Sequence, residues 1–302
     1  MHTIEIPEKK LKINVPEDLG ECNDVQYINM CQLLFKYDND QITWTEFKTH
    51  SIYYLMNMVP KNKSLGEDLD TLKYANISML AELVESFFEV NDEGQKVIKQ
   101  YYINNPIYKI RGAFKNYYGT SDEFNNVKSA EYVDALGHFA DFNETHDINY
   151  LYLLLATFYR EKESWFSRLF KPFSTDKRIA YNAERVPELA KTFKYQPIGL
   201  VYGFYLLFAS FQKYLGSAKI YVQGNEIDLS ILFNNAEETT ESELPGLNFK
   251  SILYTISESG TFGSLKEVEK IPLWELIIRM YDIRKRDLDA QANLKSQTNA
   301  TN

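Results

Sequence analysis

Two apolar stretches and the basic segment between them constrain the fold of this chain most. The stretches are residues 148–159 and 198–215, and the segment 164–173, with the sequence SWFSRLFKPF, lies between them. Each stretch is long enough to form a helix that anchors a hydrophobic core. The second approaches the roughly 20 residues that a membrane span needs. Because it also contains polar side chains and two glycines, we expect a buried core helix there and not a span.

The composition is that of a globular protein that does not bind nucleic acids. Apolar residues make up 44% of the chain and charged residues 25%, as is typical of globular domains. The net charge of −9 disfavours nucleic-acid binding, since affinity for phosphates grows with the number of Lys and Arg contacts. The amino terminus has no apolar stretch typical of a secretion signal. We interpret Cys22 and Cys31 as buried thiols in a reducing compartment.

Capping residues and apolar periodicity predict several helices. Thr43 and Glu46 form a capping box, in which each residue satisfies a free backbone amide of the other. Asn23 or Asp24 can cap a first helix that runs through Tyr37. Apolar residues at helical spacing predict further helices over residues 65–90, 129–143, 148–161, 180–192, 198–215 and 272–293.

Alternating apolar residues predict a few short strands among these helices. Residues 1–20 read as a hairpin or edge strand, and 219–229 as a hairpin that turns at Gly224. We expect Gly119 to lie in a turn that requires positive φ. The predicted fold class is therefore mainly α, a multi-helix body with one or two small β-hairpins and a carboxy-terminal helix. The predicted segments are a β segment 1–20, a helical body 21–233, an acidic linker 234–246, a helical segment 247–295 and a disordered tail 296–302.

No pattern of residues indicates catalysis, a cofactor or a metal ion. The chain has neither a G-x-S-x-G nucleophile elbow nor a Walker phosphate loop. Two histidines and three carboxylates crowd into ten residues, and side chains of these types can bind a divalent ion. Their spacing matches neither a helical His pair nor a zinc loop, so we interpret them as polar residues around a helix turn. They are His138, Asp141, Glu144, His146 and Asp147. We expect a protein that is not an enzyme.

The segment 164–173 is the first candidate for binding a partner. Trp165 and Phe166 lie close to Arg168, and a helical turn there would present an apolar face with a cationic rim. Such a face can enter a partner's groove or lie at a membrane surface. The alternative is that most of the aromatics pack against the helix over 148–159 while the cations stay in water.

The carboxy-terminal helix is the second candidate. Trp274, Ile278 and Tyr281 fall on one apolar stripe of this helix, and several arginines and lysines lie beside the stripe. We expect these three residues to contact a partner.

A series of short patterns follows in order along residues 100–290. The most specific is LATFYR at 155–160 followed by R-x-AYN at 178–182; the others lie at 110–114, 117–122, 131–142, 198–211 and 263–273. The series resembles a family of uncharacterised proteins from phages and prophages of Bacteroidetes that occur among tail-morphogenesis genes. None of the patterns is catalytic, and the first hundred or so residues have no counterpart in the resemblance.

The resemblance implies a non-enzymatic role in phage tail assembly, as a chaperone-like protein that binds a helical tail protein such as the tape-measure protein. A helical protein with exposed aromatics can cover the apolar stripes of such a chain. This role would place the protein in the cytoplasm of the bacterial host, and self-association into a homo-oligomer stays open. Tail-assembly chaperones are usually shorter than this chain. Two alternatives remain: a structural virion component, such as a tail connector or accessory protein, and a peripheral membrane protein.

Overall fold

The chain divides into two compact units, each built from two separate stretches of sequence. The computed structural model describes residues 1–6, 10–58, 67–112, 114–164, 176–222, 224–232, 250–258 and 263–301. Unit 1 consists of Met1–Ile107 and Thr192–Ser210, and unit 2 of Tyr108–Lys191 and Phe211–Asn302. This division cuts across residues 21–233, which the sequence suggests as one body. The predicted acidic linker, 234–246, lies outside the described residues.

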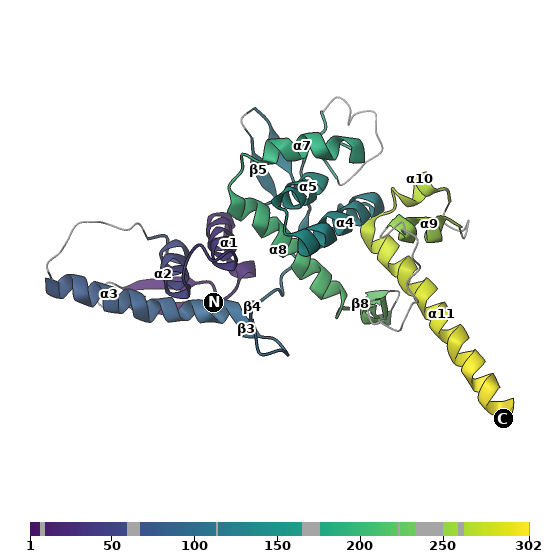
Figure 1. Cartoon of the computed structure of the whole chain (residues 1–302), viewed down its shortest axis with the longest axis horizontal. Helices are drawn as coiled ribbons and strands as arrows, with labels where there is room; N and C mark the ends of the chain where they lie inside the picture. Colours follow the sequence, from purple (N-terminus) through teal and green to yellow (C-terminus); the bar gives the residue numbers. More distant parts are fainter. Residues whose placement is uncertain are drawn as a thin grey trace. The chain divides into compact units, whose positions relative to one another are not determined.

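Helices dominate both units (Figure 1). The prediction of a mainly α fold with small β-hairpins and a carboxy-terminal helix is confirmed. Strands in the described residues form four small antiparallel sheets of two or three strands, which is more than the one or two hairpins predicted.

Unit 1 begins with the elements that have the clearest local signals. Strands β1 (His2–Ile6) and β2 (Leu11–Val15) pair as a hairpin. After the short 3₁₀ helix η2 (Leu19–Glu21), the helices α1 (Asp24–Asp38) and α2 (Trp44–Leu55) pack against each other. Both helices begin with a complete capping box, as the sequence indicates for the Thr43 and Glu46 pair.

The predicted helix over 65–90 is wrong in its second half. Helix α3 (Glu67–Ala81) passes into the 3₁₀ helix η3 (Glu82–Phe87), and strand β3 (Phe88–Val90) then pairs with β4 (Lys96–Ile98). The turn between these strands contains Gly94 at a φ of +78°, which favours glycine. The apolar residues at helical spacing that predict this helix are not all buried: Leu72 and Met79 are exposed, while Phe87 is buried.

The core of unit 1 forms where the start of α8 (Ile198–Leu215) meets α1. The Tyr27 hydroxyl donates a hydrogen bond to the Gly203 carbonyl at 2.7 Å and lies 2.8 Å from the Tyr102 hydroxyl. The α8 stretch is therefore a buried core helix, as predicted. The other large, fully buried side chains of this unit are Leu19, Met30, Phe47, Phe87, Phe193, Phe204 and Phe208.

Unit 2 is built around α4 (Ser129–Thr145) and α5 (Ile148–Phe158), which pack against each other. The predicted helix over 148–161 ends early, because Arg160–Glu161 form strand β7 at the edge of a sheet with β5 (Lys109–Arg111) and β6 (Asn116–Tyr118). Gly119 does not have positive φ. It is required for another reason, since a Cβ there would lie 2.5 Å from the Tyr159 ring.

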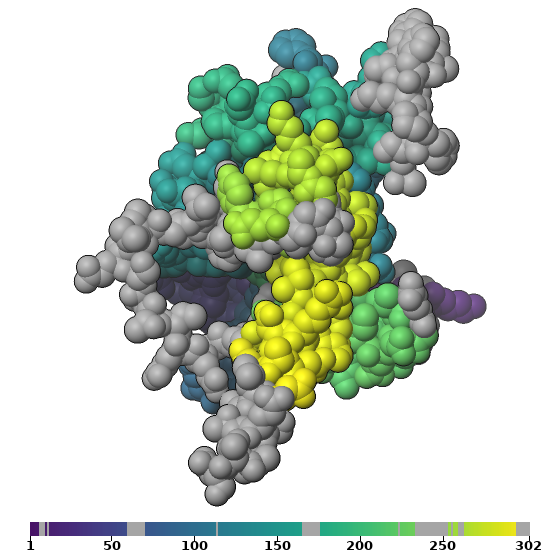
Figure 2. All heavy atoms as spheres, turned by 90° about the vertical axis from the view of Figure 1, so that its right-hand side faces the viewer, coloured from purple at the N-terminus to yellow at the C-terminus, as the bar shows by residue number. Residues whose placement is uncertain are grey.

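The remaining elements of unit 2 include the predicted hairpin over 219–229. They are η4 (Asp122–Phe124), η5 (Ala183–Arg185), α7 (Val186–Phe193), β8 (Lys219–Val222), β9 (Asn225–Asp228), η6 (Leu229–Leu232), α9 (Lys250–Glu258), α10 (Leu265–Val268) and α11 (Leu273–Thr301). Figure 2 shows α9 and α10, in yellow-green, close to the start of α11, in yellow. Helix α11 includes residues 296–301, where the sequence suggests a disordered tail.

Two thiols are buried in unit 1, as predicted, and form no disulfide. Burial raises the pKa of the Cys22 thiol to about 12 and raises the pKa of Cys31 well above its ordinary value. Near pH 8 the reactive thiolate of Cys22 is therefore present at about one part in 10⁴.

We expect both thiols to react slowly with the disulfide reagent DTNB in the native protein and rapidly in urea, where the unfolded chain exposes them. The release of coloured thionitrobenzoate over time measures this. Complete release within seconds in native buffer would contradict the burial of both side chains.

Candidate functional site

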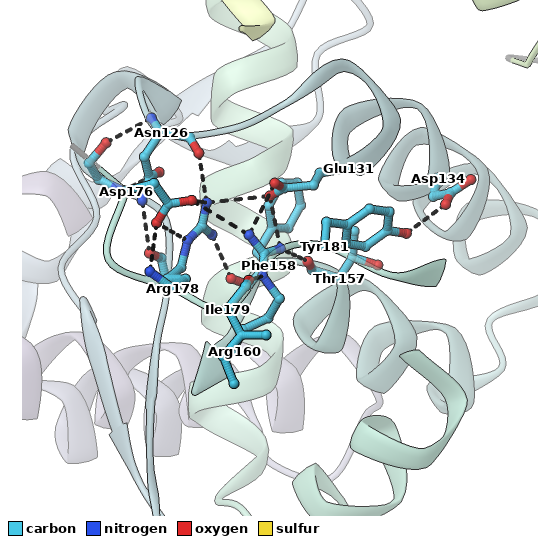
Figure 3. A network of polar contacts seen from close by, with 12 residues as sticks. Asn126, Glu131, Asp134, Thr157, Phe158, Arg160, Asp176, Arg178, Ile179 and Tyr181 are labelled. Carbon is cyan, nitrogen blue, oxygen red and sulfur yellow. Dashed lines mark hydrogen bonds and ion pairs between the residues drawn. The ribbon is translucent and has the colours of Figure 1, made fainter. Parts of the chain in front are cut away.

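The charged side chains that are almost fully buried in the described residues all belong to one network in unit 2. They are Glu131 on α4, Arg160 on β7 and Arg178, which follows the basic segment in the sequence. Because a buried charge without a partner is very unfavourable, the sequence can keep three of them only if they pair. Figure 3 shows that they do, together with the partly buried Asp176.

Arg160 connects the end of α5 to α4. Its guanidinium lies 3.0 Å from each carboxylate oxygen of Glu131. It also donates hydrogen bonds to the carbonyls of Thr157, at 2.9 Å, and Ile179, at 2.8 Å. A planar guanidinium suits this position because it offers several donors in a fixed geometry.

Arg178 occupies the centre of the network. It donates to the two carboxylate oxygens of Asp176, at 2.9 and 3.0 Å, and to Glu131 at 3.4 Å. It also donates to the carbonyls of Phe158 and Asn126, each at 2.7 Å. Glu131 and Asp176 thus neutralise the two guanidiniums where they are buried.

The network lies at the base of the segment that the sequence suggests for partner binding. The Glu163 amide donates to the Lys177 carbonyl at 2.9 Å, and the Ile179 amide donates to the Glu161 carbonyl at 2.8 Å. Lys162 and Arg178 form an antiparallel bridge between these bonds. We call this pairing of residues 161–163 with 177–179 the stem. It joins the two chain ends that lead into and out of residues 165–175.

A second polar contact extends the network along α4. The Tyr181 hydroxyl donates to Asp134 at 2.5 Å, and the Arg160 guanidinium lies 5.6 Å from the centre of the Tyr181 ring. Burial, together with the negative charge of Asp134, raises the pKa of the Tyr181 phenol far above its ordinary value. Tyr181 is therefore protonated at neutral pH and can donate this hydrogen bond.

A pocket of about 920 Å³ opens beside these residues, entirely within unit 2. None of the described residues that line it is Ser, Thr, Cys or His. Its arginines cannot release protons near neutral pH, and both are paired. The ion pairs hold these charged side chains of the lining in fixed positions. The lining residues are Lys128, Ala130, Glu131, Asp134, Arg160, Glu163, Asp176, Arg178, Ala180–Glu184, Leu253, Tyr254, Leu265, Glu269 and Lys270.

The predicted contact residues lie in two different settings. Trp165, Phe166 and Arg168 lie outside the described residues. On α11, the half-buried Trp274 donates from its indole nitrogen to the Glu123 carbonyl at 2.9 Å, and its ring packs edge-on against Phe211 and Tyr214.

Trp274 thus makes contacts inside unit 2. Ile278 and Tyr281, the other two predicted contacts on this helix, are half-buried. They expose part of their side chains next to the Trp274 packing site.

The crowded histidines and carboxylates at residues 138–147 lie around a helix turn. His138, Asp141 and Glu144 belong to α4, and His146 ends this helix with a φ of +55°. The Asp147 side chain then accepts from the Asn149 amide and caps α5. Within the described part of the chain, no group of three or more His, Cys, Asp or Glu side chains is placed to hold a metal ion.

Comparison of the chain with known protein families, curated proteins and solved structures found no match. Among the helices that the structure describes, none combines the length and the apolar character needed to cross a bilayer.

Proposed function

We propose that this protein is a non-enzymatic binding protein and that unit 2 presents residues 165–175 to a partner from the stem. The observation that carries the proposal is the stem itself, with both of its strands tied to α4 and α5 by the network of Glu131, Arg160, Asp176 and Arg178. Buried, hydrogen-bonded ion pairs of this kind hold their side chains in one well-defined arrangement. The network therefore fixes the two points at which residues 165–175 are attached to unit 2.

Fixing the two ends of a binding segment favours affinity. Bringing the ends of an eleven-residue segment together costs about 2 kcal/mol of chain entropy. In this chain, the folding of unit 2 closes the segment before any partner arrives. The partner then does not have to bring these two ends together, which lowers the entropic cost of association.

The resemblance of residues 100–290 to phage tail-morphogenesis proteins suggests the partner. We propose that it is a helical tail protein such as the tape-measure protein, whose apolar stripes need cover before the tail is built. The aromatic side chains of Trp165 and Phe166, with Arg168 beside them, match the composition that protein interfaces favour. The acidic charge of the whole chain, −9, would help to keep the complex in solution.

The test is co-purification of this chain with a tape-measure protein. Replacing Trp165 and Phe166 together with Ser should abolish recovery of this partner, because the segment loses two of its large apolar side chains. The thermal melt should stay nearly unchanged. A matched control replaces Tyr195 and Tyr221 with Ser, since both are large, exposed aromatics elsewhere in the chain.

Full recovery of the partner by the double variant would contradict the proposal. So would a large loss of helicity in that variant, because the two side chains would then belong to the core.

A further inference from the structure

The pocket in unit 2 is a second place where another chain can bind. Its volume, about 920 Å³, lies in the upper part of the range for sites that enclose a ligand. The residues that line it come from the first turns of α4, from the stretch from Asp176 to Glu184, and from α9 and α10.

The lining carries an excess of negative charge. Its described residues include six carboxylates and four cationic side chains. Arg160 and Arg178 are neutralised in place by Glu131 and Asp176. Taken together, the described lining residues carry two more negative charges than positive ones. A concave site of one predominant sign concentrates ligands of the opposite sign.

Apolar and aromatic side chains line the same pocket. Leu265 contributes aliphatic surface from α10, whereas Leu253 on α9 is buried. Tyr254 is 41% exposed, and an exposed tyrosine at a pocket edge offers both a ring face and a hydroxyl to a ligand. A ring face attracts a cation that lies over it.

We infer that this pocket binds a peptide segment of a partner protein in which an arginine or lysine lies beside apolar residues. The cationic group would lie near Glu184 and Glu269, and the apolar residues would pack on Leu265 and Tyr254. Nucleic acids and other polyanions are disfavoured by the same charge. This inference does not depend on the proposed function, because it is argued from the described lining residues alone.

The probe for this inference is a fluorescein-labelled decapeptide of Leu, Ala and Arg, compared with the same peptide carrying Glu for every Arg. We expect the arginine peptide to raise fluorescence anisotropy in a saturable way when the full chain is added at low salt. Binding should weaken in 150 mM salt, since the Debye length falls to about 8 Å. The glutamate peptide should not bind.

Two pairs of charge reversals locate the site. Glu184→Lys with Glu269→Lys changes the pocket and should raise the dissociation constant of the arginine peptide by about tenfold or more. The control, Glu144→Lys with Asp287→Lys, changes the net charge of the chain by the same amount at exposed residues outside the lining. It should change the dissociation constant of the arginine peptide by less than about twofold.

The Trp165→Ser, Phe166→Ser variant should bind the peptide like the unmodified chain, which separates this site from the proposed one. Three results would overturn the inference: no saturable binding at low salt, equal binding of the glutamate peptide, or equal weakening by the two pairs of reversals. Circular dichroism of each variant ensures that a loss of binding is not a loss of folding.

Discussion

Replacing Glu131 with Gln is expected to lower the free energy of unfolding of unit 2 by about 3–5 kcal/mol, because it removes one partner from a buried ion network. Arg160 then keeps Asp176 as its nearest carboxylate, at 3.7 Å. Arg178 loses its second carboxylate and has to share Asp176 with Arg160. Two guanidiniums would stay buried with a single negative charge between them.

Urea unfolding measures this effect in unit 2 if Trp274 is the only tryptophan. Trp274 packs against Phe211 and Tyr214, so its fluorescence reports the unfolding of this unit once Trp44 and Trp165 are replaced with Phe. The matched control is Glu161→Gln, which removes a carboxylate that pairs with the exposed Lys115 at 2.9 Å. We expect the control to leave the unfolding midpoint almost unchanged, since solvent-exposed pairs contribute little. Equal shifts in the two variants would show that the buried network does not hold the stem.

Replacing Gly199 with Ala is expected to destabilise unit 1 by about 3 kcal/mol, the upper end of the usual cost of overpacking. A Cβ at this position would lie 2.1 Å from the Ile28 carbonyl oxygen and 2.7 Å from the Gln32 Cβ. The first of these is a backbone atom of α1, so no side-chain rotation can relieve the overlap. The helices α1 and α8 would have to move apart.

The matched control for this prediction is Gly137→Ala on α4. A Cβ there would meet nothing within 4 Å, and alanine is favoured over glycine inside a helix by about 1 kcal/mol. The control should therefore stabilise unit 2 slightly, while Gly199→Ala weakens unit 1. Urea unfolding followed by circular dichroism compares the two. Close packing of α1 on α8 would be contradicted if both variants were stabilised.

Local signals in the sequence were enough to predict many of the elements. The capping box of Thr43 and Glu46 involves residues three apart, and both of its hydrogen bonds are present. The hairpin over 219–229 also depends on neighbours, with Gly224 at its turn. Such elements are determined by interactions between residues that are close together in the sequence. They can therefore be predicted from local patterns of residues.

The network at the stem could not be predicted in the same way. Glu131 lies 29 residues from Arg160 and 47 from Arg178, and nothing in the sequence pairs them. Arg160 and Arg178 do occur in the most specific motif of the resemblance, and an arginine directly after a buried apolar stretch is a signal that could have indicated a buried ion pair. The predicted helix over 148–161 ends early because Arg160 and Glu161 pair with strand β6, which lies far away in the sequence.

The sequence contains a pattern that indicates the close packing of α1 on α8, although we did not predict this packing from it. Gly199 and Gly203 are four residues apart, so they lie on one face of α8, and a Cβ on either would collide with α1. The spacing of small residues at i and i+4 lets two helix backbones approach. The exposed Leu72 and Met79 on α3 are the opposite case, since their periodicity predicts burial and the structure places them in solvent.

We propose that this chain binds a helical tail protein during assembly and does not transform a substrate. Quantitative mass spectrometry of tail-assembly intermediates and of finished particles from the same infected cells tests this proposal. We expect the chain to be present in the intermediates together with the tape-measure protein and missing from the finished particles. A fixed stoichiometry in finished particles would contradict it and would indicate a structural component of the virion.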